Sequence, residues 1–294
     1  MEAGSILAIL PRSIRTIYQS QCMQAESLRE IRLRAGKPLI FKKSSGETKL
    51  NYIVSKGDID ELLSYISRYS LYAYEEEMRQ GFITIEGGHR VGLSGQVIME
   101  NGHVKNFRYV SAVNIRISHE VKGCGNDVIP YITDPLHHTL IISPPGCGKT
   151  TLLRDLIRQI SGNTMNVGVV DERSELGGCH KGVPQNDLGI RTDILDGCPK
   201  AEGMMMLIRT MAPDVIAVDE IGTEDDVHAI AYVMHCGCKI LATVHGSSLE
   251  EVRRKPVLGP VIQSKQFERY ILLGNERKTG EVKAIYDQEG RRLL

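Results

Sequence analysis

The first part of the chain, up to about residue 125, mixes short strand patterns with one helical pattern. Residues 30–34 alternate polar and apolar side chains at period two, and after a turn residues 39–41 form a second apolar run. This spacing predicts two adjacent strands. Ser55 with Asp58 three residues later is typical of a helix N-terminus, and the apolar residues that follow have helical spacing.

A second strand group follows in the same part of the chain. Gly87-Gly88 separates residues 82–85 from residues 91–94, which favours a hairpin, and residues 110–117 alternate again. These patterns predict a smaller α+β domain over residues 1–122.

The pattern changes after the glycine-rich stretch Gly123-Cys124-Gly125-Asn126, which is the best candidate boundary. Helical segments now separate short, continuous apolar runs at 139–142, 167–170, 215–218 and 240–243. Such runs are expected of parallel strands covered on both faces, with ligands at their carboxyl ends. The sequence therefore predicts an α/β domain over residues 137–294, preceded by a linker at 123–136.

The strongest chemical signal lies between the first of these strands and the next helical segment. It reads Ser143-Pro144-Pro145-Gly146-Cys147-Gly148-Lys149-Thr150-Thr151. Gly146 and Gly148 allow the backbone N–H groups to converge on phosphate oxygens, and a helix that begins near Lys149 adds its positive end. We expect Lys149 to reach the β- and γ-phosphates and the Thr150 hydroxyl to bind Mg²⁺.

One position departs from the usual phosphate-loop pattern, because Ser143 stands where the first glycine is normally found. The remainder of the motif is complete and lies between a strand and a helix. We therefore predict a site for ATP and Mg²⁺, although no base-reading motif distinguishes ATP from GTP.

A metal-linked acid is expected at the end of a neighbouring strand. Residues 215–218 end in Asp219 and Glu220 at the carboxyl end of that strand. Asp219 is predicted to bind Mg²⁺ through water, and Glu220 to polarise the attacking water.

Two further candidates follow the neighbouring strands. Glu172, in Asp171-Glu172-Arg173, is either a second water-orienting acid or a cap bonded to Arg173 or Arg191. His245, in Thr243-Val244-His245, either senses the γ-phosphate through a hydrogen bond or has a structural role.

The composition of the chain indicates its cellular environment rather than its chemistry. The 294 residues carry 36 basic and 36 acidic side chains, so no overall field favours nucleic acid or an acidic membrane surface. The seven cysteines are odd in number and scattered, which favours a reducing cytoplasm over a disulfide framework. Because no apolar run approaches the roughly 20 residues of a membrane-spanning helix, we expect any membrane contact to be peripheral.

Taken together, the phosphate loop, Asp171-Glu172-Arg173, the segment 209–214 leading into Asp219-Glu220, and Thr243-Val244-His245 resemble the type II/IV secretion ATPase superfamily. Residues 30–38, 144–155 and 196–200 are more closely similar to a family of stage III sporulation proteins within it. The resemblance covers nearly the whole chain.

This resemblance implies a RecA-like C-terminal ATPase domain and a cytoplasmic homohexamer. It further implies a motor that energises a membrane-embedded channel between mother cell and forespore, working from the mother-cell side. In the superfamily the N-terminal domain supplies arginines to the nucleotide phosphates. Arg116 is the best match, and Arg90 and Arg34 are the next candidates. The alternative for each is a solvated arginine on a strand face.

Two other functions remain open at the level of sequence. A nucleic-acid translocase of the same ATPase class would require a basic, aromatic-lined channel, whereas the chain has no tryptophan and four phenylalanines, so no nucleic-acid partner is expected. A nucleotide-responsive scaffold with little turnover would not require water-orienting acids such as Glu220 and Glu172.

Overall fold

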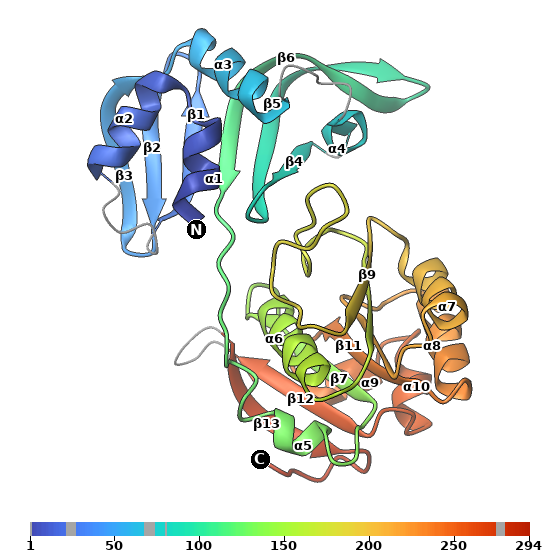
Figure 1. The fold of residues 1–294 in the computed structure, drawn as a ribbon. Coiled ribbons are helices and arrows are strands. Elements are labelled where there is room, and N and C mark those ends of the chain that lie inside the picture. The colour runs from blue at the N-terminus through green and yellow to red at the C-terminus, as the bar shows by residue number, and fades with distance from the viewer. Residues whose placement is uncertain (1, 22–27, 68–73, 80, 275–279) are drawn as a thin grey trace. The chain divides into compact units, whose positions relative to one another are not determined.

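The computed structural model describes residues 2–21, 28–67, 74–79, 81–274 and 280–294 (Figure 1). The chain divides into two compact units. The first comprises Met1–His119 with Gly178–Gln185, and the second comprises Glu120–Gly177 with Asn186–Leu294. The chain therefore leaves the second unit after Gly177, contributes a short segment to the first, and returns at Asn186.

The first unit is built on a six-stranded antiparallel sheet with the strand order β3-β2-β1-β6-β5-β4. Its strands are β1 (Leu28–Arg34), β2 (Pro38–Lys43), β3 (Gly46–Ile53), β4 (Phe82–Ile85), β5 (His89–Glu100) and β6 (His103–Arg116). Its helices are α1 (Glu2–Ile9), α2 (Arg12–Gln21), α3 (Lys56–Ser67) and α4 (Glu75–Arg79).

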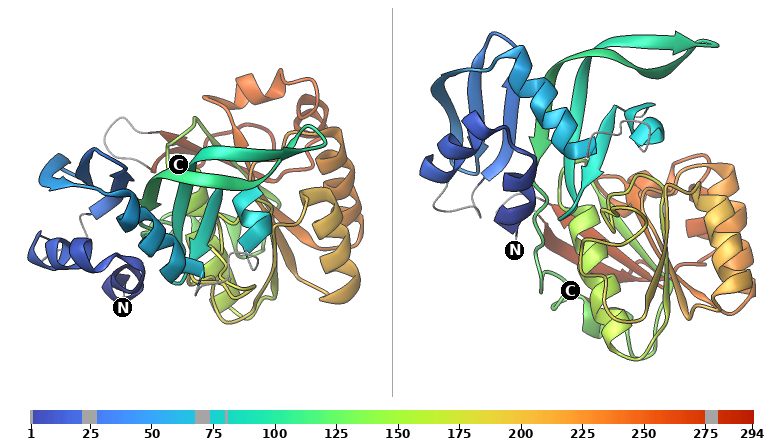
Figure 2. Two further views of the ribbon diagram at one scale, coloured as in Figure 1. Left: turned by 90° about the horizontal axis from the view of Figure 1, so that it is seen from above. Right: turned by 45° about the horizontal axis from the view of Figure 1, so that its top comes forward.

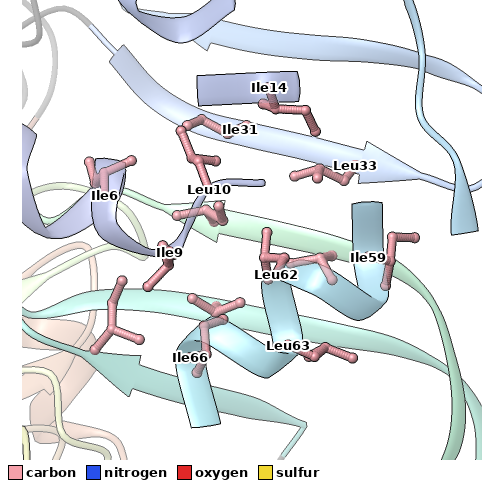
Figure 3. Packing of buried hydrophobic residues seen from close by; sticks show 14 of the residues in the cluster. Ile6, Ile9, Leu10, Ile14, Ile31, Leu33, Ile59, Leu62, Leu63 and Ile66 are labelled. Carbon is pink, nitrogen blue, oxygen red and sulfur yellow. The ribbon is translucent and has the colours of Figure 1, made fainter. Parts of the chain in front are cut away.

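Alternation along the strands creates the core of this unit. Ile31 and Leu33 are fully buried, whereas Arg32 between them is only partly covered. Figure 3 shows these side chains packed against apolar residues of α1, α2 and α3, including Ile6, Ile14 and Leu62. One face of the sheet therefore carries the helices, as expected for an antiparallel sheet with a single buried face.

Local signals in this unit agree with the structure. Ser55 Oγ accepts the N–H of Asp58 at 3.1 Å, and Asp58 Oδ2 accepts the N–H of Ser55 at 2.7 Å, so the two residues form the expected helix cap before α3. The hairpin at Gly87-Gly88 is confirmed as the β4–β5 turn. The strand expected at 110–117 is longer, because β6 pairs with β5 along a ribbon that extends beyond the sheet (Figure 2).

The second unit contains a seven-stranded sheet with the order β13-β12-β7-β11-β10-β8-β9. Six neighbouring strands run parallel and β13 pairs antiparallel at one edge. The strands are β7 (Thr139–Ser143), β8 (Val167–Asp171), β9 (Thr192–Asp196), β10 (Val215–Val218), β11 (Lys239–His245), β12 (Arg269–Gly274) and β13 (Glu281–Asp287). The helices are α5 (Ile129–Ile132), α6 (Lys149–Gly162), α7 (Lys200–Thr210), α8 (Glu224–His235), α9 (Leu249–Arg253) and α10 (Gly259–Gln263).

Helices cover both faces of this sheet, which confirms the predicted α/β fold with a parallel sheet (Figure 1). Odd-numbered strand residues such as Ile141 pack with α6, and even-numbered residues such as Ile142 pack with α7 and α8. The continuous apolar runs are explained by this double coverage. The four strands predicted from those runs are β7, β8, β10 and β11. We did not predict β9, β12 or β13.

The glycine-rich boundary stretch is attached to the second unit. Gly123 and Gly125 donate their N–H groups to the Asp155 carboxylate of α6, at 3.1 and 2.8 Å. A Cβ on Gly125 would lie 2.7 Å from Leu156 Cδ2, so a larger residue there would have to displace this side chain of α6. The second unit begins at Glu120, so residues 123–136, which the sequence indicated as a linker, belong to that unit. Within the described ranges, no helix is both long and apolar enough to cross a bilayer.

Candidate functional site: a phosphate loop facing two acids

The phosphate loop follows the buried strand β7 and leads directly into α6. Gly146 and Gly148 have φ of 73° and 81°, in the left-handed region that glycine adopts without strain. Gly148 is the N-cap of α6 and has no side chain to occupy the first N–H groups of the helix. The loop therefore presents main-chain donors and the positive end of a helix, the arrangement that binds phosphate.

The structure explains how serine is accommodated at position 143. Ser143 is the last residue of β7, pairs with His245 of β11, and is fully buried. Its φ is not positive, and its hydroxyl donates to the Pro144 carbonyl at 2.9 Å. Position 143 therefore has no conformational requirement for glycine.

The loop lysine and threonine meet the two acids that follow β10. Lys149 Nζ lies 2.9 Å from Glu220 Oε1 and 3.7 Å from Asp219 Oδ1, and the lysine side chain is only 5% exposed. The Thr150 hydroxyl donates to Asp219 Oδ2 at 2.7 Å. Residues 71 positions apart in sequence thus form one cluster at the carboxyl edge of the sheet.

This donor set fits a magnesium ion. A hydroxyl oxygen and a carboxylate oxygen that already lie within hydrogen-bond distance of each other are hard oxygen ligands, which Mg²⁺ prefers. Thr243 supports the arrangement from β11, because its hydroxyl donates to Asp219 Oδ1. Thr150 and Asp219 are therefore the residues that would hold the ion.

Glu220 has a strained backbone and a carboxylate surrounded by cations. Its φ is 56°, a left-handed conformation that costs a non-glycine residue about 1–3 kcal/mol and often occurs at functional sites. Its N–H donates to the Thr243 hydroxyl at 2.9 Å. Burial alone would raise the pKa of Glu220, but the hydrogen bond and charge of Lys149, then Arg173 and His245, lower it below the ordinary value.

His245 ends β11 beside this carboxylate. Its Nε2 lies 2.9 Å from Glu220 Oε1 and 3.5 Å from Lys149 Nζ. The ammonium of Lys255 donates to the carbonyl of His245 and so fixes the end of the strand. The imidazole therefore contacts both the loop lysine and the acid, while its role toward a γ-phosphate remains a prediction.

Asp171, the last residue of β8, organises the loop that follows it. Its carboxylate accepts the N–H groups of Glu175, Leu176 and Gly177 at 2.8–2.9 Å. Deep burial nevertheless raises the pKa of Asp171 to about 6, because these backbone bonds offset the desolvation only in part. Asp171 is thus a structural residue at the base of this loop.

Glu172 has a partner that the sequence did not indicate. Lys200, at the start of α7, donates to Glu172 Oε2 at 2.5 Å, whereas the anticipated cap would have paired Glu172 with Arg173 or Arg191. Its role as a second water-orienting acid stays a prediction. Arg173 instead contacts Glu220 Oε2 at 2.7 Å.

Arg116 belongs to the first unit, at the end of β6. It lies in register with Glu30 of β1 and Arg90 of β5, and its side chain is exposed. Its proposed contact with nucleotide phosphates remains a prediction, as does the alternative of a solvated strand-face arginine.

Sequence reasoning missed Thr243 and Arg173 as parts of the cluster. Each was part of a motif that we had recognised, since Thr243 begins Thr-Val-His and Arg173 directly follows Asp-Glu. Position within a strand-end motif was the available signal, but contact with Asp219 or Glu220 requires the strand order β8-β10-β11.

A parallel sheet with a phosphate loop and paired acids at its carboxyl edge defines a P-loop protein with the fold of the secretion ATPases. The X-ray structure of the Legionella pneumophila ATPase DotB matches with a TM-score of 0.58 at 16% identity, covering 88% of this chain and 75% of that chain. The crystal structure of the pilus retraction motor PilT with bound ADP gives a TM-score of 0.61 at 16% identity, covering 86% and 76%. At these identities the likeness concerns the fold.

The family is defined more closely by sequence. The model of the family "Sporulation stage III, protein AA" matches residues 2–293. Stage III sporulation protein AA of Bacillus subtilis (strain 168) is 41% identical over 300 residues, covering 99% of this chain and 97% of that protein. The chain therefore belongs to the stage III sporulation protein AA family, which confirms the resemblance seen in its motifs.

Proposed function

We propose that this protein is a Mg²⁺-dependent ATPase that works as a motor for a channel between mother cell and forespore. One observation carries the enzymatic part: Lys149, Thr150, Asp219 and Glu220 converge at one edge of the sheet. Family membership supports the link to sporulation. The similarity in fold to a pilus retraction motor with bound ADP supports nucleotide use and motor action.

Different residues carry out the separate parts of the proposed reaction. The N–H groups of the loop and the ammonium of Lys149 bind the phosphates of the substrate. Thr150 and Asp219 would hold Mg²⁺, which would neutralise phosphate charge. Glu220 accepts a hydrogen bond from the attacking water and then its proton. His245 keeps the Glu220 carboxylate oriented through its Nε2 contact.

Phosphate release from ATP by purified protein tests the enzymatic part. Lys149→Ala is expected to abolish turnover, because the ammonium is the buried cation closest to both acids. Lys265→Ala is a matched control, since Lys265 forms an exposed ion pair with Glu289. Turnover that survives Lys149→Ala while the control behaves like wild type would remove the assigned site.

The motor and its partners form the finer part of the proposal. We propose a homohexamer that acts at the cytoplasmic face of a membrane on channel proteins. Light scattering after size exclusion, with and without a non-hydrolysable triphosphate, is expected to show a nucleotide-dependent ring. Complementation of a sporulation defect by wild type but not by Lys149→Ala would link turnover to sporulation. A monomer under all conditions, including in the presence of the membrane partners, would contradict the ring.

A further inference from the structure

Arg173 and the loop lysine contact different oxygens of the Glu220 carboxylate. Its NH1 donates to Glu220 Oε2 at 2.7 Å, while Glu220 Oε1 is occupied by Lys149 and His245. The two oxygens of the candidate base are thus engaged by different groups. A carboxylate that accepts a proton from water needs an accessible oxygen. Within the described part of the chain, the oxygen bound by Arg173 is Oε2.

The two cations around Glu220 differ in their freedom to move. The side chain of Lys149 is 5% exposed, whereas that of Arg173 is 65% exposed. An exposed ion pair is screened by water and contributes little free energy, so breaking it costs little. The guanidinium of Arg173 already lies largely in solvent and can move away from Glu220. The ammonium of Lys149 is buried and cannot move away in the same manner.

The backbone of Arg173, in contrast, is firmly anchored. It directly precedes Ser174, whose N–H donates to the Asp171 carbonyl, and the loop beyond is held by the Asp171 carboxylate. An exposed guanidinium on a backbone held by this loop can exchange between two nearby acceptors without rearranging the loop.

The neighbouring acid does not compete for this arginine. Glu172 is bound by Lys200, whose side chain is 13% exposed. Arg173, Glu220, Asp219, Glu172 and Lys200 line one common hollow beside the end of β10. The cation best placed to exchange between Glu220 and an incoming anion in this hollow is therefore Arg173.

We propose that Arg173 recognises the terminal phosphoryl group of a bound nucleoside triphosphate by moving from Glu220 Oε2 to the phosphate oxygens, which frees Oε2 for the attacking water. The proposal rests on the ATPase function proposed above and deepens it. Arginine suits this exchange because its planar fork binds carboxylate and phosphate alike, in either case through two parallel N–H donors. A diphosphate offers no terminal phosphoryl group at this position and leaves the arginine on Glu220.

Nucleotide affinities measured by fluorescence titration test the proposal without relying on turnover. The proteins are wild type, Arg173→Ala, Arg173→Lys and the control Lys265→Ala, and the probes are ADP and a non-hydrolysable ATP analogue, both with Mg²⁺. Arg173→Ala is expected to lose roughly tenfold or more in affinity for the analogue, as for a hydrogen bond between charged groups. Its affinity for ADP should be unchanged or slightly higher. Arg173→Lys should recover part of the loss, and Lys265→Ala should match wild type.

Equal losses for both nucleotides, or no loss for the analogue, would overturn the role of Arg173 and leave the ATPase function standing. The proposed function itself fails in a different way, if wild type binds neither nucleotide or if Lys149→Ala binds and hydrolyses ATP like wild type. Circular dichroism checks that each variant is folded, which is expected because Arg173 is exposed.

Discussion

Replacing Glu220 with glutamine separates the chemistry of this site from its architecture. The side chain keeps its size and the strained backbone of residue 220 keeps its hydrogen bond to Thr243. The amide no longer accepts a proton, so the water-orienting step is lost while the phosphate loop stays intact. Loss of a positioned general base typically costs 10²- to 10⁴-fold, or about 3–5 kcal/mol of barrier.

The structure also bounds the effect on stability. At an effective dielectric of about 20, charges separated by 2.9 Å, as in the Lys149–Glu220 pair, attract by about 6 kcal/mol. Desolvation of both groups offsets most of this, and Lys149 retains Asp219 at 3.7 Å. The Arg173 contact is exposed and adds little. We therefore expect Glu220→Gln to lower the free energy of unfolding by about 1–3 kcal/mol, the range for a hydrogen bond to a charged group.

The sign of the pH dependence follows from the lowered pKa of Glu220. A group whose folded pKa is depressed stabilises the protein above its unfolded value of 4.5 and loses this contribution as the pH falls through the folded pKa. Urea unfolding should therefore show the difference between wild type and Glu220→Gln at neutral pH and a smaller difference in acid.

Phosphate release and nucleotide binding, measured side by side, decide the outcome. Turnover should fall at least a hundredfold while the ATP analogue still binds. A variant with turnover close to wild type would refute the role of Glu220 as the base and favour a scaffold with little catalysis. A variant that no longer binds nucleotide would show that Glu220 acts through structure.

Two further substitutions test the supporting contacts. Thr243→Val removes the hydroxyl that joins Asp219 to the backbone of Glu220. The Mg²⁺ concentration required for half-maximal turnover should therefore rise about tenfold or more, as for other residues that orient metal ligands. An unchanged requirement would contradict this role. Asp58→Asn weakens the cap before α3 and should cost about 1–3 kcal/mol in urea unfolding at pH 7. Burial would raise the pKa of Asp58, but its hydrogen bonds, beginning with that from Ser13, lower it, so the penalty should shrink below pH 3.8. A penalty independent of pH would contradict this account.

Local patterns in the chain were sufficient to predict much of this protein. The phosphate loop, the cap at Ser55 and the hairpin at Gly87-Gly88 depend on residues close together in sequence, whose backbone conformations are set by glycines, short polar side chains and periodic burial. The position of Asp219 and Glu220 at the carboxyl end of a parallel strand was likewise predicted from the apolar run at residues 215–218.

What only the tertiary structure decided depends on strand order and on contacts between distant residues. The parallel addition of β9 and β12, the docking of Gly125 on α6, and the transfer of residues 178–185 to the first unit leave no periodic signal in the sequence. The same holds for the choice of Arg173 as the partner of Glu220 and Lys200 as the partner of Glu172. Side-chain partners of this kind are fixed only when the sheet brings separate strand ends to one edge, because neither residue alone encodes the distance between them.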